Sequence, residues 1–187
     1  MNLYKISNLT FFFAIIVSAC NPPNDQKVQS SHKEISLDTL MAAIDKETSS
    51  FFAGNYEGWK DCWLHDSLSS QTWNNDDGSF SSAQGWEAID KQGKDWIEKY
   101  YKNGKNIIHP EYFRKEIRSK ILSDTSVYLT WTQYNAYSTK ELYGVSRETR
   151  LMILKDGKWK IFQVAAFWDF KNKIGKDFVV HLMKTTI

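Results

Sequence analysis

The chain has 187 residues, a formal net charge of +2 and an aromatic content of 15 %, including eight tryptophans. A charge so close to neutral argues against a nucleic-acid partner, which would favour a clustered basic surface. The hydrophobic share of 42 % suffices for one ordinary domain with a buried core, and it excludes an acidic, disordered chain.

The N-terminal residues have the pattern of a bacterial lipoprotein signal peptide. Lys5 precedes a short apolar run, Leu9 to Val17, which leads into Val17-Ser18-Ala19-Cys20. A helix over that run would span roughly 14 Å, too short for a bilayer core of about 30 Å. We therefore predict that residues 1–19 are removed and that lipid on Cys20 anchors the protein to the bacterial cell envelope. Asn21 is not the acidic residue that retains some lipoproteins at the inner membrane, which favours the periplasmic side of the outer membrane.

Residues 20–35 are predicted to be a flexible tether. Between Asn21 and Glu34 the chain holds two prolines and mostly polar residues, with Val28 as its single aliphatic side chain. The folded domain is then expected over residues 36–187. If Cys20 carries lipid, Cys62 is alone in this domain, so we expect no disulfide within the chain and a buried, apolar role for Cys62.

Three helices are expected in the first half of the domain. Ser36 is a suitable N-cap for a helix whose apolar residues recur at helical spacing and which ends at Gly54-Asn55. A shorter helix runs from Tyr56 to about Leu64. After a strand over Leu68 to Trp73, a third helix extends from about Gly85 to Asn103-Gly104, where the glycine stops it.

Further along, the apolar periodicity changes from that of a helix to that of a strand. Asp156-Gly157 is the strongest local signal, because this pair is typical of a two-residue hairpin turn. Helices followed by antiparallel strands predict an α+β domain in which the helices pack on one sheet. The four expected strands are Glu111 to Leu122, Val127 to Tyr137, Tyr143 to Lys155 and Lys158 to Phe170.

The hairpin turn also predicts a register. On one face it places Leu154 opposite Trp159, Met152 opposite Ile161, Arg150 opposite Gln163, and Glu148 opposite Ala165. We expect the helices to cover this face, which is apolar near the turn and polar further from it. The opposite face is also substantially apolar, so it is expected either to form a homodimer or to remain a moderately apolar surface of a monomer.

Small-molecule pockets are typically lined by apolar side chains together with a few polar groups, and a face that changes from apolar to polar supplies both. We predict a pocket that binds a partly apolar small molecule through four tryptophans and three polar residues. The alternative is that Arg150 and Glu148 form a pair that only closes the end of the core. We expect no metal and no cofactor, since the four histidines lack ligand spacing and no phosphate-binding loop occurs. The predicted pocket residues are Trp63, Trp73, Trp86, Trp131, Glu148, Arg150 and Gln163.

Five segments of the chain have the pattern of a known family, namely Phe52-Ala53-Gly54-Asn55-Tyr56, Trp63-Leu64-His65-Asp66, Gly85-Trp86-Glu87-Ala88-Ile89, Arg147-Glu148-Thr149-Arg150 and Lys155-Asp156-Gly157-Lys158-Trp159-Lys160-Ile161. On these segments the chain, from Leu37 to Asp169, resembles the NTF2-like superfamily, especially its SnoaL-like and ketosteroid-isomerase-like members. The resemblance implies a cone-shaped fold, with three N-terminal helices packed on a strongly bent, mostly antiparallel sheet around a pocket. It also implies that homodimers through the outer sheet face are common.

The chain departs from this family at the residues that carry isomerase chemistry. Glu47 stands where the resemblance implies a tyrosine, and Gln71 stands near the expected aspartate, while Gln163 and Ala165 replace two histidines of other relatives. We therefore expect small-molecule binding. One alternative is a cofactor-free isomerase, dehydratase or hydrolase that uses Glu47 as base and Arg150 as oxyanion partner. The other is a protein-interaction module that acts through its sheet face.

Overall fold

The computed structural model describes residues 35–108 and 111–185. The predicted signal peptide, the lipidation site at Cys20 and nearly all of the tether lie outside these residues. Among the described residues, no helix combines the length and the apolar character needed to cross a lipid bilayer.

A six-stranded sheet forms the framework, in the order β2-β1-β8-β7-β6-β5. β1 runs parallel to β8 and the other neighbours are antiparallel, so the sheet is mixed but mostly antiparallel, as predicted. A separate pair, β3 (Tyr101–Lys102) and β4 (Lys105–Asn106), follows α3. The six strands are β1 (Ser70–Asn74), β2 (Phe80–Gln84), β5 (Tyr112–Ser123), β6 (Ser126–Ala136), β7 (Leu142–Lys155) and β8 (Lys158–Gly175).

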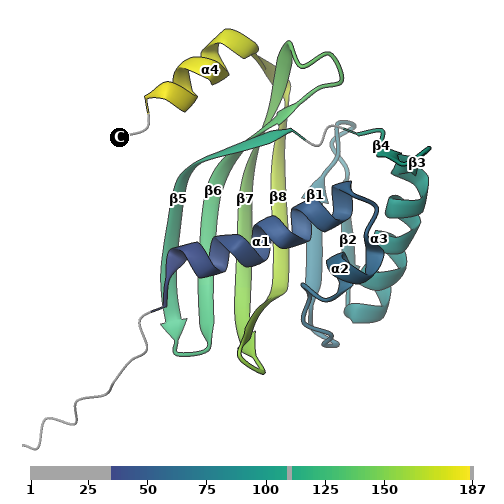
Figure 1. The fold of residues 1–187 in the computed structure, drawn as a ribbon, viewed down its shortest axis with the longest axis vertical. Coiled ribbons are helices and arrows are strands. Elements are labelled where there is room, and N and C mark those ends of the chain that lie inside the picture. Colours follow the sequence, from purple (N-terminus) through teal and green to yellow (C-terminus); the bar gives the residue numbers. More distant parts are fainter. Residues whose placement is uncertain (1–34, 109–110, 186–187) are drawn as a thin grey trace, which may run out of the picture. The chain divides into compact units, whose positions relative to one another are not determined.

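The helices do not match the expectation of three N-terminal helices. α1 (Leu37–Phe52) crosses one face of the long strands, while α2 (Tyr56–Lys60) and α3 (Trp86–Tyr100) lie at the β1–β2 end (Figure 1). α3 comes after the β1–β2 hairpin in the chain. A fourth helix, α4 (Lys176–Lys184), was not expected, because the apolar alternation of the last strand gave no indication that a helix would follow it.

The core lies between α1 and the sheet face that it crosses, called here the inner face. Leu40 and Ile44 project from α1 onto this face, and both are fully buried. On the sheet, the row formed by Val127, Met152 and Ile161 is equally buried. The predicted cover of Met152 and Ile161 by helices is therefore confirmed.

The β7–β8 turn forms as predicted, with positive φ angles of 51° at Asp156 and 74° at Gly157. The pairs Leu154–Trp159 and Met152–Ile161 also match the prediction. Beyond them the register shifts, because a bulge at Phe162 inserts one extra residue into β8.

The bulge makes the two remaining predicted pairs wrong. Arg150 lies opposite Val164 instead of Gln163, and Glu148 lies opposite Ala166 instead of Ala165. Since successive side chains of a strand alternate between faces, the shift turns Gln163 to the outer face, where it is exposed. Arg150 and Glu148 remain on the inner face, and both are buried.

α4 covers part of the outer face. Its fully buried Val179 packs with Ala136 and Tyr143, which alternate along their strands with the inner-face residues Asn135 and Gly144. The end of the outer face near α4 is therefore occupied by the chain itself.

Candidate functional site

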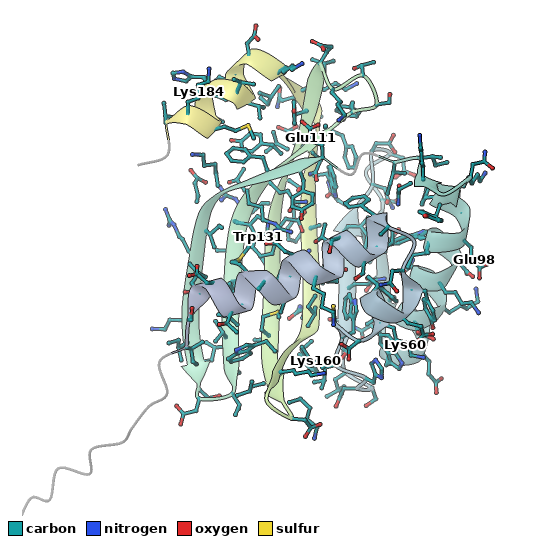
Figure 2. The ribbon with its side chains drawn as sticks, in the orientation of Figure 1. Lys60, Glu98, Glu111, Trp131, Lys160 and Lys184 are labelled. Atoms are coloured by element: carbon teal, nitrogen blue, oxygen red, sulfur yellow. The ribbon has the colours of Figure 1, made fainter. Side chains whose placement is uncertain are left out.

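A cavity of about 340 Å³ lies between the C-terminal half of α1 and the inner face of the sheet. Figure 2 shows Trp131 on the sheet face that α1 crosses, next to this region. One part of the wall is aromatic or aliphatic and the other is polar. The lining residues are Glu47, Thr48, Phe51, Phe52, Trp59, Gln71, Trp96, Ile108, Gln133, Asn135, Tyr137, Glu148, Arg150, Val164, Ala166 and Trp168.

Three tryptophans from three different elements belong to the apolar part of the wall, and Trp59 among them is almost fully buried. Trp59 of α2 is held against α3, where a Cβ atom on Gly93 would lie only 2.0 Å from the Trp59 ring. Trp96 of α3 packs edge-on against Trp73, with ring centroids 4.8 Å apart. Trp168 comes from β8, on the same face as Ala166. These rings form a rigid surface suited to a flat or compact apolar molecule.

The polar wall is centred on a buried ion pair between neighbouring inner-face positions of β7. The Nη1 of Arg150 donates to Glu148 Oε2 at 3.0 Å and to the backbone oxygen of Thr149 at 2.8 Å. The Ser146 hydroxyl donates to Glu148 Oε1 at 2.7 Å. The Arg150 guanidinium also lies 5.0 Å from the ring centre of Trp131. The pair is thus oriented by several contacts, as a buried charge requires.

Amide side chains extend this wall along the sheet. Trp131 Nε1 donates to Gln133 Oε1 at 3.2 Å, and Gln133 Nε2 donates to Asn135 Oδ1 at 2.8 Å. Asn135 Nδ2 in turn donates to Ser146 Oγ at 3.3 Å. Arg114 binds the same Gln133 oxygen through Nε at 3.1 Å. The chain of hydrogen bonds holds the polar wall in one arrangement.

Glu47 projects from α1 into the cavity. Its Oε1 accepts a hydrogen bond from Trp59 Nε1 at 3.0 Å, and its Oε2 accepts one from Thr48 Oγ1 at 3.2 Å. Burial raises the pKa of Glu47 above its usual value, against the opposing charge of Arg150 and the Trp59 hydrogen bond. The carboxyl group can therefore hold a proton at a pH where an exposed glutamate would not.

Three of the sequence-predicted site residues line the cavity, namely Glu47, Glu148 and Arg150. Gln163 does not, because the β8 bulge turns it outward. The inner-face positions that the prediction assigned to Gln163 and Ala165 belong instead to Val164 and Ala166.

None of the four tryptophans predicted to line the pocket is among the residues that line this cavity. Trp63 and Trp131 are almost fully buried in the core. Trp73 packs against Trp96, and Trp86 stacks on the ring of His65, with centroids 3.9 Å apart. The size of the tryptophan side chains predicted that they are buried. Composition alone does not distinguish tryptophans in the core from tryptophans on the wall of a cavity.

The lining tryptophans Trp59, Trp96 and Trp168 were not predicted. Strand alternation could have predicted the position of Trp168, because Trp168 lies on the same face of β8 as Val164 and Ala166. That prediction requires the bulge at Phe162 to be taken into account. For Trp59 and Trp96 the wall position depends on contacts between separate elements, which helical spacing does not reveal.

Metal chemistry finds no support in the described part of the chain, where no group of three or more His, Cys, Asp or Glu side chains could hold an ion. Cys62 is buried, and its Sγ donates to the backbone oxygen of Gly58 at 3.2 Å. It is placed as an apolar core residue, as predicted.

Comparison with known proteins identifies the fold of the chain. A scan against protein-family models and a search of curated proteins both find no match. The chain is similar to a protein of unknown function with a cystatin-like fold from Nostoc punctiforme, at 10 % identity and a TM-score of 0.53, over 74 % of this chain and 96 % of that chain. A cystatin-like protein from Caulobacter vibrioides matches at 13 % identity and a TM-score of 0.51, over 79 % and 97 %.

A third similar structure is a provisionally assigned scytalone dehydratase from Novosphingobium aromaticivorans, at 12 % identity and a TM-score of 0.51, over 74 % of this chain and 85 % of that chain. Identities this low establish the fold and not the activity. The chain has a cystatin-like fold with a mixed, mostly antiparallel sheet and a few helices, which is the coarser part of what the sequence resemblance implies.

Proposed function

We propose that the cavity between α1 and the sheet binds a small, partly apolar molecule. The observation that carries this proposal is the division of its wall, with Trp59, Trp96 and Trp168 on one part and the Arg150–Glu148 pair on the other. Apolar rings supply affinity by burying ligand surface, and a few fixed polar groups supply orientation. No cofactor is part of this proposal.

The buried polar wall favours ligand binding over a purely structural role. A core filled with apolar side chains would avoid the desolvation cost of burying Arg150 and Glu148. Here the pair borders a space of about 340 Å³ and is exposed by only 9 % and 3 %. A polar group on a ligand would be paired there, out of bulk water.

A fragment screen by thermal shift, using the purified protein and a matched pair of variants, tests the proposal. Ala166→Phe adds a ring inside the cavity, whereas Ala165→Phe adds the same ring on the outer face. Fragments should raise the melting temperature of the wild type and of Ala165→Phe, but not that of Ala166→Phe. Equal shifts in all three proteins would contradict binding in the cavity.

A cofactor-free enzyme is the second candidate, favoured by the raised pKa of Glu47 at the cavity wall. An isomerase, dehydratase or hydrolase could use Glu47 as acid or base, with Arg150 stabilising negative charge on oxygen. The dehydratase assignment of the Novosphingobium protein agrees with this class. Glu47→Gln should abolish turnover of any substrate found while leaving its binding intact. Retained turnover would exclude the role.

Anchoring at the cell envelope is a further part of the proposal and rests on the Val17-Ser18-Ala19-Cys20 sequence. Expressed in a bacterium with a radiolabelled fatty acid, the wild type should incorporate label and sediment with outer membranes. Cys20→Ser should do neither. A labelled Cys20→Ser protein would contradict lipidation at this residue.

The protein-interaction alternative rests on apolar side chains of the outer face. Phe167 is 56 % exposed and Tyr128 is 40 % exposed, beyond the part that α4 covers. If this face forms a homodimer, light scattering should give twice the chain mass, and Phe167→Lys should give the monomer mass. A wild-type protein that remains monomeric at all concentrations would exclude the homodimer.

A further inference from the structure

Arg150 leaves one edge of its guanidinium without a partner. Both of its hydrogen bonds come from Nη1, one to Glu148 and one to the Thr149 backbone. Nε is buried and makes no hydrogen bond, and Nη2 makes none with any described residue. A buried donor without an acceptor is costly, and among the residues that line the cavity Arg150 is the one with such a buried donor.

The geometry of that edge is specific. The N–H groups of Nε and Nη2 are nearly parallel in a planar guanidinium, and together they match the two oxygens of a carboxylate. Glu148 does not compete for this edge, because it occupies Nη1 and is itself held by Ser146. The contact with Trp131 further restricts rotation of the guanidinium plane.

We propose that the ligand of this cavity is a monocarboxylate with an aromatic or alicyclic body, whose carboxylate binds side-on to Nε and Nη2 of Arg150. This inference rests on the proposed small-molecule function and specifies its ligand class. The body of the ligand lies against Trp59, Trp96 and Trp168, which form the apolar wall.

The unpaired edge of the Arg150 guanidinium is the group that would accommodate one negative charge on the ligand. Arg114 lies on the Trp131 ring as Arg150 does, 5.4 Å from the ring centre, but its own charge is paired with Asp45. Two lining residues with carboxyl groups, Glu148 and Glu47, would oppose an anion, and Glu148 is already paired with Nη1 of Arg150. Burial raises the pKa of Glu47, and in its protonated form the carboxyl group donates a hydrogen bond instead of repelling the ligand. A dianion would find no second free guanidinium edge on this wall among the described lining residues.

Calorimetric titration of the purified protein with paired probes tests the ligand class. The acids are 2-naphthoate, phenylacetate and cyclohexanecarboxylate, and each is compared with its neutral primary amide. We expect the best acid to bind roughly tenfold to a hundredfold more tightly than its amide, because hydrogen bonds to charged groups are stronger than neutral ones.

Variants then assign this preference to Arg150. Arg150→Met should abolish the preference for the acid, and so should the double variant Arg150→Met/Glu148→Gln, which removes the buried charge that the single change leaves unpaired. Arg147→Met is the control, because Arg147 lies on the outer face of the same strand and is exposed. It should retain the preference.

The outcomes separate the two proposals. If acid and amide bind wild type equally and the Arg150 variants bind like wild type, the cavity still binds small molecules but the carboxylate inference is wrong. If neither acids nor amides bind the folded wild type, the cavity function fails and the inference fails with it.

Discussion

Glu47 and Arg150 show how single residues set the chemistry of this cavity. Burial raises the pKa of Glu47, whose two oxygens accept hydrogen bonds from Trp59 and Thr48, whereas Arg150 has a buried Nε without a hydrogen-bond partner. Burying such polar groups costs free energy of folding, so they are expected mainly where they serve a function. They therefore indicate a functional site more specifically than large apolar residues do.

Glu47→Gln should increase stability at high pH. Because burial raises the pKa of Glu47, the folded state binds its proton more tightly than the unfolded state. The resulting stabilisation is complete below the unfolded-state pKa and is lost as the pH rises through the folded-state pKa. The loss is about 1.4 kcal/mol for each pKa unit of the shift. A glutamine is neutral throughout and escapes this loss.

Urea unfolding at about pH 5 and about pH 9 measures the effect. The gain of Glu47→Gln over wild type should be larger at the higher pH. Glu98→Gln, at an exposed position of α3, should change stability by less than about 0.5 kcal/mol at both values. An effect of Glu47→Gln that does not vary with pH would show that this carboxyl group is not protonated by burial.

Cys62 provides a second prediction at this scale. Burial raises the pKa of its thiol to about 11, so little reactive thiolate forms near neutral pH. In a Cys20→Ser background, iodoacetamide should modify the folded protein at least about a hundredfold more slowly than the urea-unfolded chain. Similar rates in the two states would mean that Cys62 is accessible.

At the scale of elements, the sequence predicted more of the individual strands and helices than of their mutual placement. The Asp156-Gly157 turn and the first two cross-strand pairs formed as expected, because turn chemistry and alternation are local. The Phe162 bulge was not foreseen, since it carries no glycine or other local marker. Because of this one extra residue, Val164 and Ala166 occupy the inner-face positions on the cavity wall that were predicted for Gln163 and Ala165.

Gly93 is where α2 and α3 meet, and it tests how the apolar wall is positioned. An alanine would normally stabilise a helix interior by about 1 kcal/mol relative to glycine. Here its Cβ would lie 2.0 Å from the Trp59 ring, so Gly93→Ala should instead destabilise the protein by about 1–3 kcal/mol. It should also weaken fragment binding, because Trp59 must move.

Urea unfolding compares this variant with Glu98→Ala, which places the same residue at an exposed position of α3. The control should have nearly wild-type stability. A Gly93→Ala protein as stable as the control would show that the α2–α3 contact is looser than the structure indicates.

At the scale of the whole molecule, the α+β fold could be predicted from the order of its elements and from its resemblance to NTF2-like proteins. The site could be predicted only in part. Glu148 and Arg150 were identified because polar residues at inner-face positions are unusual, and Glu47 because it stands where the resemblance implies a tyrosine. The aromatic wall was not, since it is assembled from α2, α3 and β8, which are distant in the sequence.

The indole N–H signals in a proton–nitrogen NMR spectrum offer the most direct test that the cavity is a binding site. The chain has eight tryptophans, which can be assigned through single Trp→Phe variants. During titration with 2-naphthoate and its amide, we expect the largest shifts for Trp59, Trp96 and Trp168, and small shifts for Trp63 and Trp86. A spectrum that does not change, or whose changes are confined to tryptophans outside the cavity wall, would contradict this expectation.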